Sequence, residues 1–212
     1  MTNSNALTVL GRSNSSNVQK VMWLLDEIEQ PCERVDVGGQ FGGNKDADYL
    51  AKNPNGVVPT LIHGDAVVWE SNAILRYLAN YFRADALYPA ESVARSWVDR
   101  WMDWQLSSLA PVNGLLFRRI VRTPAHERSQ DAIDEAREQN AELFGLLDRF
   151  LERSEYLGGG SFSIADIAVG PLAYRWLTLP VERPHFRNVQ RWYDLLCERK
   201  AFRKRVVEIG LS

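Results

Sequence analysis

The spacing of apolar residues differs between the first and second parts of the chain. Before about residue 84, β-branched and aliphatic runs alternate with runs at helical spacing. The strand-like runs cover 6–11, 32–37, 59–62 and 66–69, and the helical ones cover 17–28, 46–52 and 70–82. This order predicts a βαβαββα arrangement: a four-stranded mixed sheet whose first two strands are parallel and whose last two form a hairpin.

After residue 90 only helical spacing remains. Apolar positions over 94–109, 133–151 and 189–196 predict helices, the last followed by a basic tail. Pro111 and Asn113-Gly114 are expected to bend or end the first of them. The change of pattern, with 83–90 as the candidate linker, predicts an α/β domain over 1–84 and an all-α domain over 91–212. A ligand cleft is expected between the two domains.

The most specific local signal in the second part is the sequence FSIADI, which predicts the start of a further helix. Ser163 and Asp166 form an S-x-x-D capping box, and Phe162 and Ile167 occupy the positions of a hydrophobic staple. A cap of this kind is worth roughly 1 kcal/mol. We therefore expect Asp166 to act in folding rather than in chemistry.

Composition narrows the class of protein. Hydrophobic residues make up 45% of the chain, charged residues 25%, and the net charge is -2. These values are typical of a soluble globular protein and give no reason to expect a nucleic acid, a membrane or a metal as a partner. No apolar run is long enough to cross a bilayer, and the first ten residues lack a signal-peptide pattern. Cys32 and Cys197 have no metal-binding spacing, so a reduced, cytoplasmic setting is expected.

Three stretches are candidates for chemistry. In 53–73, Pro59 belongs at the first residue of a strand or in a special turn, for which a cis Val58-Pro59 bond is one solution. Glu70-Ser71 then opens a helix, whose free N–H groups favour an anion. The glycine-rich loop 38–44 fits no phosphate-binding pattern and is expected to be a mobile loop. The loop 12–17 is rich in serine and asparagine, which are also the residues of a plain helix N-cap.

Together these motifs resemble the glutathione transferase family, and most closely a bacterial GstB-type branch related to theta-like enzymes. The resemblance rests on NPNGVVP, on Glu70-Ser71 and on FSIADIA. With GRSNSSNVQKV, RWMDW and NVQRWYDLL, it covers essentially the whole chain. It implies a thioredoxin-like N-terminal domain, an all-α C-terminal domain, glutathione as cosubstrate and a homodimer. The implied reaction joins the glutathione sulfur to a small electrophile. Glutathione-dependent peroxidase or dehalogenase chemistry, and a non-catalytic glutathione-binding protein, are the alternatives.

The resemblance also implies roles for individual residues near the thiol. Ser15 is expected to donate a hydrogen bond to the glutathione sulfur, and Asn17 to offer an amide donor. Ser13 and Ser16 stay open as alternatives to Ser15. The loop has neither a tyrosine nor a cysteine, so a tyrosine-type or protein-thiol mechanism is disfavoured.

Other implied contacts hold the glutathione peptide. Val58, before Pro59, would pair through its backbone with the cysteinyl residue of glutathione, Ser71 would bind the γ-glutamyl carboxylate, and Glu70 the α-amino group. Val57 stands where many relatives carry a lysine, so Gln40 or Lys52 is the candidate to replace that charge.

The electrophile side is predicted from the first long helix. Trp101 and Trp104, together with Arg118, Arg119 and Arg122, lie on or just after it. Arg118 and Arg122 would share a face of a helix, which suggests a small anionic or polar electrophile. The alternative is a solvated basic face above core tryptophans.

Overall fold

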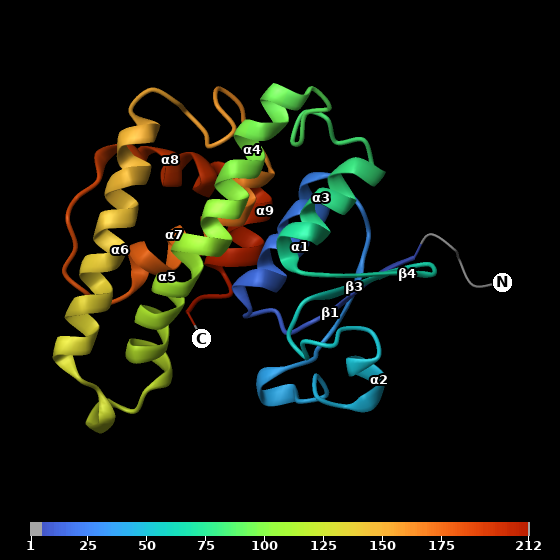
Figure 1. The fold of residues 1–212 in the computed structure, drawn as a ribbon, viewed down its shortest axis with the longest axis horizontal. Helices are drawn as coiled ribbons and strands as arrows, with labels where there is room; N and C mark the ends of the chain where they lie inside the picture. Colours follow the sequence, from blue (N-terminus) through green and yellow to red (C-terminus); the bar gives the residue numbers. More distant parts are fainter. Residues whose placement is uncertain (1–5, 212) are drawn as a thin grey trace.

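A single mixed sheet and the helices around it make up the computed structural model, which describes residues 6–211 (Figure 1). The predicted domain ranges 1–84 and 91–212 also include residues 1–5 and 212, which lie outside this description. The strands are β1 (Leu7–Leu10), β2 (Glu33–Val35), β3 (Thr60–His63) and β4 (Ala66–Trp69). Their order in the sheet is β2-β1-β3-β4, with β1 parallel to β2 and antiparallel to β3. The expected βαβαββα order, with its closing hairpin, is confirmed.

Helices α1 (Ser16–Glu27) and α3 (Ser71–Tyr81) lie together on one side of the sheet, toward the second half of the chain (Figure 1). The short helix α2 (Ala47–Leu50) and the 3-10 turn η1 (Gly39–Phe41) lie in the loops on the other side. The apolar side chains of α1 are almost completely buried, because α1 packs between the sheet and the second half. This position makes the start of α1 a meeting point of both halves.

The first long helix of the second half does not end at Pro111, so that part of the prediction is wrong. It runs without a break through α4 (Ser92–Trp104), a π-helical turn η2 (Gln105–Leu109), α5 (Ala110–Phe117) and a second π-helical turn η3 (Arg118–Arg122). The wide turn η2 ends two residues before Pro111, where the proline ring and its missing N–H would otherwise disrupt regular α-helical bonding.

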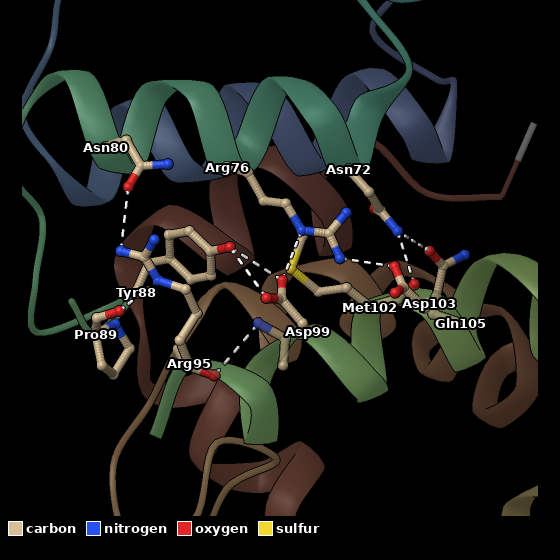
Figure 2. A network of polar contacts seen from close by, with 12 residues as sticks. Asn72, Arg76, Asn80, Tyr88, Pro89, Arg95, Asp99, Met102, Asp103 and Gln105 are labelled. Carbon is tan, nitrogen blue, oxygen red and sulfur yellow. Dashed lines mark hydrogen bonds and ion pairs between the residues drawn. The ribbon is translucent and has the colours of Figure 1, made fainter. Parts of the chain in front are cut away.

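Polar side chains join α3 to α4 (Figure 2). Arg76 of α3 pairs with Asp99 at 2.7 Å and with Asp103 at 2.6 Å. Nearer the start of α3, Asn72 donates to the carbonyl of Met102 at 2.8 Å and to Gln105 Oε1 at 3.0 Å. The boundary between the two halves is therefore held by specific hydrogen bonds as well as by apolar packing.

The remaining helices surround α7 (Ile164–Thr178), which is buried along most of its length. Gly170 of α7 faces Trp23 of α1, and a Cβ atom there would lie 2.7 Å from the indole. Glycine therefore permits the close approach of these two helices. Beside α7 lie α6 (Gln130–Leu151) and α8 (Arg187–Glu198), and the short turn η4 (Ala125–Glu127) precedes α6. No helix in the described range is long and apolar enough to cross a membrane.

The chain after α8 is helical and is not the basic tail that the sequence predicted. It forms α9 (Lys200–Phe202) and the π-helical turn η5 (Arg203–Val207). Two arginines after α8 form ion pairs with the acidic end of α1. Arg199 pairs with Glu27 at 2.6 Å, and Arg205 pairs with Asp26 at 2.7 Å. The basic residues thus serve as partners for α1, a role that local sequence does not reveal.

The predicted capping box is confirmed at the start of α7. Asp166 is completely buried, and its carboxylate accepts from the backbone N–H groups of Leu157 and Ser163, from the Ser163 hydroxyl and from Trp192 Nε1. Burial raises the pKa of Asp166 to about 6, although these hydrogen bonds act in the opposite direction. The carboxylate therefore joins the start of α7 to α8.

We expect Asp166→Ala to lower the free energy of unfolding by about 3 kcal/mol. The substitution removes the cap and leaves several buried donors without an acceptor. Denaturant unfolding followed by circular dichroism measures this loss. Ser161→Ala, at an exposed position five residues earlier, is the matched control and should change stability by less than about 0.5 kcal/mol. An equal effect of the two substitutions would show that Asp166 has no special structural role.

Candidate functional site

The loop before α1 carries the predicted thiol-activating residues. Ser15 is the N-cap residue of α1, yet its side chain makes no capping hydrogen bond. It is 8% exposed, so its hydroxyl lies close to the free N–H groups of the helix with little water around it. Ser16 is the first residue of the helix and is equally buried, while Ser13 is half-buried. The plain capping explanation therefore does not account for the Ser15 hydroxyl.

Asn17 contacts the start of α3. Its Oδ1 accepts a hydrogen bond from Ser71 Oγ at 3.3 Å and another from Lys20 Nζ at 3.0 Å. Its amide nitrogen has no hydrogen-bond partner within residues 6–211 and is therefore available as a donor. The side chain is exposed, unlike its two neighbours. The structure thus places two predicted site residues, 54 positions apart in sequence, in direct contact.

Val58 and Pro59 join the loop after α2 to β3 through a cis peptide bond. Val58 packs beside Gly11 and Gly38, where Cβ atoms would lie only 3.2 Å from its side chain. The carbonyl of Val57, by contrast, accepts hydrogen bonds from Tyr49 Oη at 2.6 Å and from the side-chain amide of Asn53. Across the described chain, the N–H and C=O groups of Val58 make no hydrogen bond. They form a short stretch of unpaired backbone beside the start of α1, suited to pairing with an extended peptide.

Glu70 has an unusual backbone conformation, with φ 68° and ψ 115°. A residue with a side chain rarely adopts a positive φ, and such strain is concentrated at functional sites. The Glu70 side chain is exposed and does not cap α3, while Ser71 is buried at the first position of the helix. The conformation thus places a carboxylate and a hydroxyl together at the positive end of α3.

The two candidates to replace the missing lysine at Val57 differ in the structure. Lys52 Nζ donates to the carbonyl of Asp48 at 2.7 Å, so this ammonium is held by its own helical turn. Gln40 is exposed on η1. Arg12, which sequence reasoning did not propose, crosses to the same turn, and its Nε would lie 2.7 Å from a Cβ atom at Gly39. Arg12 is therefore the cation beside this loop.

The arginines of the long helix do not act together. Arg119 turns toward α6 and donates to the carbonyl of Ala132, and its place in the electrophile site stays a prediction. Arg118 and Arg122 lie instead near Arg175 of α7, and Arg122 also lies near Arg12. Burial, together with repulsion from Arg122, Arg12 and Arg118, lowers the pKa of Arg175 to about 10. Nothing in the local sequence of Arg12 or Arg175 indicated this cluster.

The two tryptophans of α4 lie apart from this cluster. Trp101 is buried and contacts the ring of half-buried Trp104, with their centroids 5.0 Å apart. Along a helix that rises about 1.5 Å per residue, Trp104 and Arg118 are roughly 20 Å apart. Trp101 is therefore a core residue, and Trp104 does not share a site with Arg118.

A buried lysine completes the site and was missed from the sequence. Lys20 Nζ donates to Asn17 Oδ1 and, at 2.9 Å, to Gln105 Oε1 across the boundary between the halves. Burial, together with repulsion from Arg175, lowers the pKa of Lys20 to about 7, while Glu70 opposes the shift. The Ser71 hydroxyl, the Asn17 amide and the Lys20 amino group thus meet near the start of α1. Hydrogen-bond donors beside a helix N-terminus lower the pKa of a thiol. In the described chain no group of three or more His, Cys, Asp or Glu side chains is arranged to hold a metal ion.

Comparisons with known proteins place this geometry in a family. Residues 5–80 match the model of the glutathione S-transferase N-terminal domain, and residues 113–200 match that of the C-terminal domain. The chain is 41% identical to glutathione S-transferase GstB of Escherichia coli, over 97% of this chain and 100% of that protein. It is 32% identical to glutathione S-transferase 3 of Zea mays, over 97% of this chain and 95% of the other. A crystal structure of the theta class glutathione S-transferase from Xanthomonas axonopodis pv. citri with glutathione bound has a TM-score of 0.94 and 45% identity, covering 98% of this chain and 100% of that one.

The strain at Glu70 predicts a difference between two substitutions that both remove the carboxylate. Glu70→Gly is expected to give a protein more stable than Glu70→Ala by about 1 kcal/mol, because glycine tolerates a positive φ. Denaturant unfolding of the two variants measures the difference. At the exposed helical position Ala73, where φ is not positive, Ala73→Gly should instead destabilise the protein. If Glu70→Ala equals or exceeds Glu70→Gly in stability, the backbone at Glu70 is not strained.

Proposed function

This chain belongs to the glutathione S-transferase family, and from that premise we propose that it joins the glutathione thiolate to small electrophiles at the start of α1. Its fold is a thioredoxin-like α/β half followed by a helical half, as in that family. The observation that carries the proposal is the uncapped hydroxyl of Ser15, placed at a buried helix N-terminus beside the contact between Asn17 and Ser71. Ser15 is the donor to the sulfur, and Asn17 is a second donor.

Glutathione lies along the unpaired backbone of Val58 in this proposal. The cysteinyl residue of glutathione pairs with the Val58 N–H and C=O groups, next to the cis Pro59. The γ-glutamyl carboxylate is held by the backbone N–H of Ser71 at the N-terminus of α3, while Glu70 binds the α-amino group. Gln40 and Arg12 lie on the side of the glycine carboxylate. Each charged group of the tripeptide thereby meets a group of opposite charge or a hydrogen-bond donor.

Catalysis needs a thiolate near neutral pH. A free thiol has a pKa of about 8.5, so lowering it by about two units requires roughly 2.7 kcal/mol of preference for the ionised sulfur. A hydrogen bond to a charged acceptor supplies about 1.5–3 kcal/mol, and the positive end of a helix adds about 0.5 kcal/mol or more. Ser15, Asn17 and the dipole of α1 are together sufficient for this shift. An electrophile bound beside the activated sulfur then reacts faster, because the two reacting groups are held close together.

The electrophile in this proposal is a small anion. Arg12, Arg118 and Arg175 make no ion pair with a carboxylate within residues 6–211, and Arg122 belongs to the same cluster. Mutual repulsion among these guanidinium groups would be relieved by a bound anion. The cluster includes Arg12 from the loop that carries Ser15, so a bound anion would lie near the thiolate.

We also propose a cytoplasmic homodimer with the domain division at 1–84 and 91–212. Both cysteines are free thiols, in keeping with a reducing compartment. Large apolar side chains are exposed on β4, α3, α4 and η2, and we propose that some of them lie in the dimer interface. These residues are Val67, Trp69, Tyr81, Val93, Trp97 and Leu106.

We expect Ser15→Ala to raise the pKa of the bound glutathione thiol more than Asn17→Ala does. The hydroxyl of Ser15 lies in the drier position, where a hydrogen bond to an anion is stronger. Ultraviolet absorbance of the bound thiolate, titrated against pH, measures both shifts; Ser13→Ala is the control. The opposite order would move the main role to Asn17. Glutathione binding without turnover of any electrophile would favour a non-catalytic binding protein.

The arginine cluster predicts selectivity by charge. Arg118→Met is expected to lower kcat/KM about tenfold for a haloacid, with little change for the matching neutral haloamide. Arg119→Met is the matched control, because the neighbouring guanidinium turns toward α6 and should affect both substrates alike. Equal losses with both substrates on Arg118→Met would contradict an anionic electrophile.

A further inference from the structure

The buried ammonium of Lys20 has no explanation in packing alone. Lys20 is 1% exposed and makes no ion pair with any carboxylate in the described chain. A buried charge without a counter-charge is costly, and an apolar residue of similar size often replaces it at no loss of stability. The position next to the proposed thiolate site therefore calls for a functional reason.

One hydrogen bond of the Lys20 amino group holds the side chain of Asn17. Oδ1 of Asn17 accepts from Lys20 Nζ at 3.0 Å and from Ser71 Oγ at 3.3 Å, so both of its acceptor positions are in use. Rotation of the exposed amide is thereby restrained, and its N–H groups face away from Lys20. Without the ammonium, only the longer bond from Ser71 would hold the amide.

The second hydrogen bond of the Lys20 amino group is made to Gln105 in the helical half. Gln105 is 1% exposed, and its Oε1 accepts from Lys20 Nζ at 2.9 Å and from Asn72 Nδ2 at 3.0 Å. Asn72 in turn donates to the carbonyl of Met102 (Figure 2). Gln105 begins the π-helical turn η2, a type of turn that is frequent at functional sites. Lys20 is thus positioned from α4 and α3 as well as from α1.

Two charged groups on neighbouring elements act on the ammonium of Lys20. Arg175 of α7 disfavours it, and Glu70, just before α3, favours it. The groups in direct contact, Asn17 and Gln105, are neutral. The hydrogen bonds to these two amides are therefore the specific interactions that locate Lys20.

We propose that Lys20 is a positioning residue, which holds Asn17 Oδ1 so that the Asn17 amide N–H groups are directed at the glutathione sulfur. This role rests on the proposed function, since it requires glutathione at the start of α1. Lys20 acts through Asn17 and does not touch the substrate. The helical half thereby takes part in activating a thiol that is bound by the other half.

A double-mutant cycle tests this role. The pKa of the bound glutathione thiol is measured by ultraviolet absorbance in the wild type, Lys20→Met, Asn17→Ala and the double variant. We expect Lys20→Met to raise that pKa by about half a unit, which is a roughly threefold fall in the ionisation constant of the bound thiol. In the Asn17→Ala background the same substitution should leave the pKa unchanged, because Lys20 then has nothing to position. Unfolding curves for the four proteins report any purely structural effect.

An equal rise of the thiol pKa in both backgrounds would overturn the proposal, because Lys20 would then act independently of Asn17. No rise in either background would overturn it as well, and would leave Lys20 a structural residue. Lys20→Leu replaces Lys20→Met in the same cycle if the latter gives no folded protein. A wild-type protein that fails to bind or ionise glutathione would instead refute the proposed function, and this result needs no variant.

Discussion

Burial of α1 on all sides is the constraint on which the rest of the site depends. Its apolar residues pack against the sheet and against α7, where Gly170 allows Trp23 to approach closely. Polar groups on so enclosed a helix must find partners in the other half of the chain. Lys20 finds Gln105, while Asp26 and Glu27 pair with arginines that follow α8. The start of α1, with Ser15, is therefore held by both halves at once.

This arrangement leaves a small set of groups uncommitted, and those groups define the site. The Ser15 hydroxyl does not cap its helix, the Val58 backbone is unpaired, and Glu70 has a strained conformation. A protein that optimised only its stability would satisfy or relax such groups. Their convergence on one place, between a helix N-terminus and a cluster of arginines, fits a tripeptide thiol and a small anion better than any purely structural role.

The fold was largely predictable from the sequence, because hydrophobic periodicity and capping motifs are local signals. The order of strands and helices in the first half, its closing hairpin and the capping box at Ser163 all followed from short stretches of sequence. Lys20 and Arg175 were not predictable, because the partners that give them meaning lie far away in sequence: Gln105 is 85 residues from Lys20. The contact of Arg119 with α6 was not predictable for a related reason, since the long helix continues through a π-helical turn that changes the direction of its side chains.

The central claim is that binding at the start of α1 ionises the glutathione thiol. Titration calorimetry of the wild-type protein with glutathione near pH 7, repeated in buffers of different ionisation enthalpy, measures the protons released per molecule bound. Free glutathione is almost fully protonated at its thiol at this pH. A bound thiol whose pKa is lowered by about two units would therefore release about 0.7 proton for each glutathione bound. Binding with no proton release would show that the thiol stays protonated, and would contradict the account.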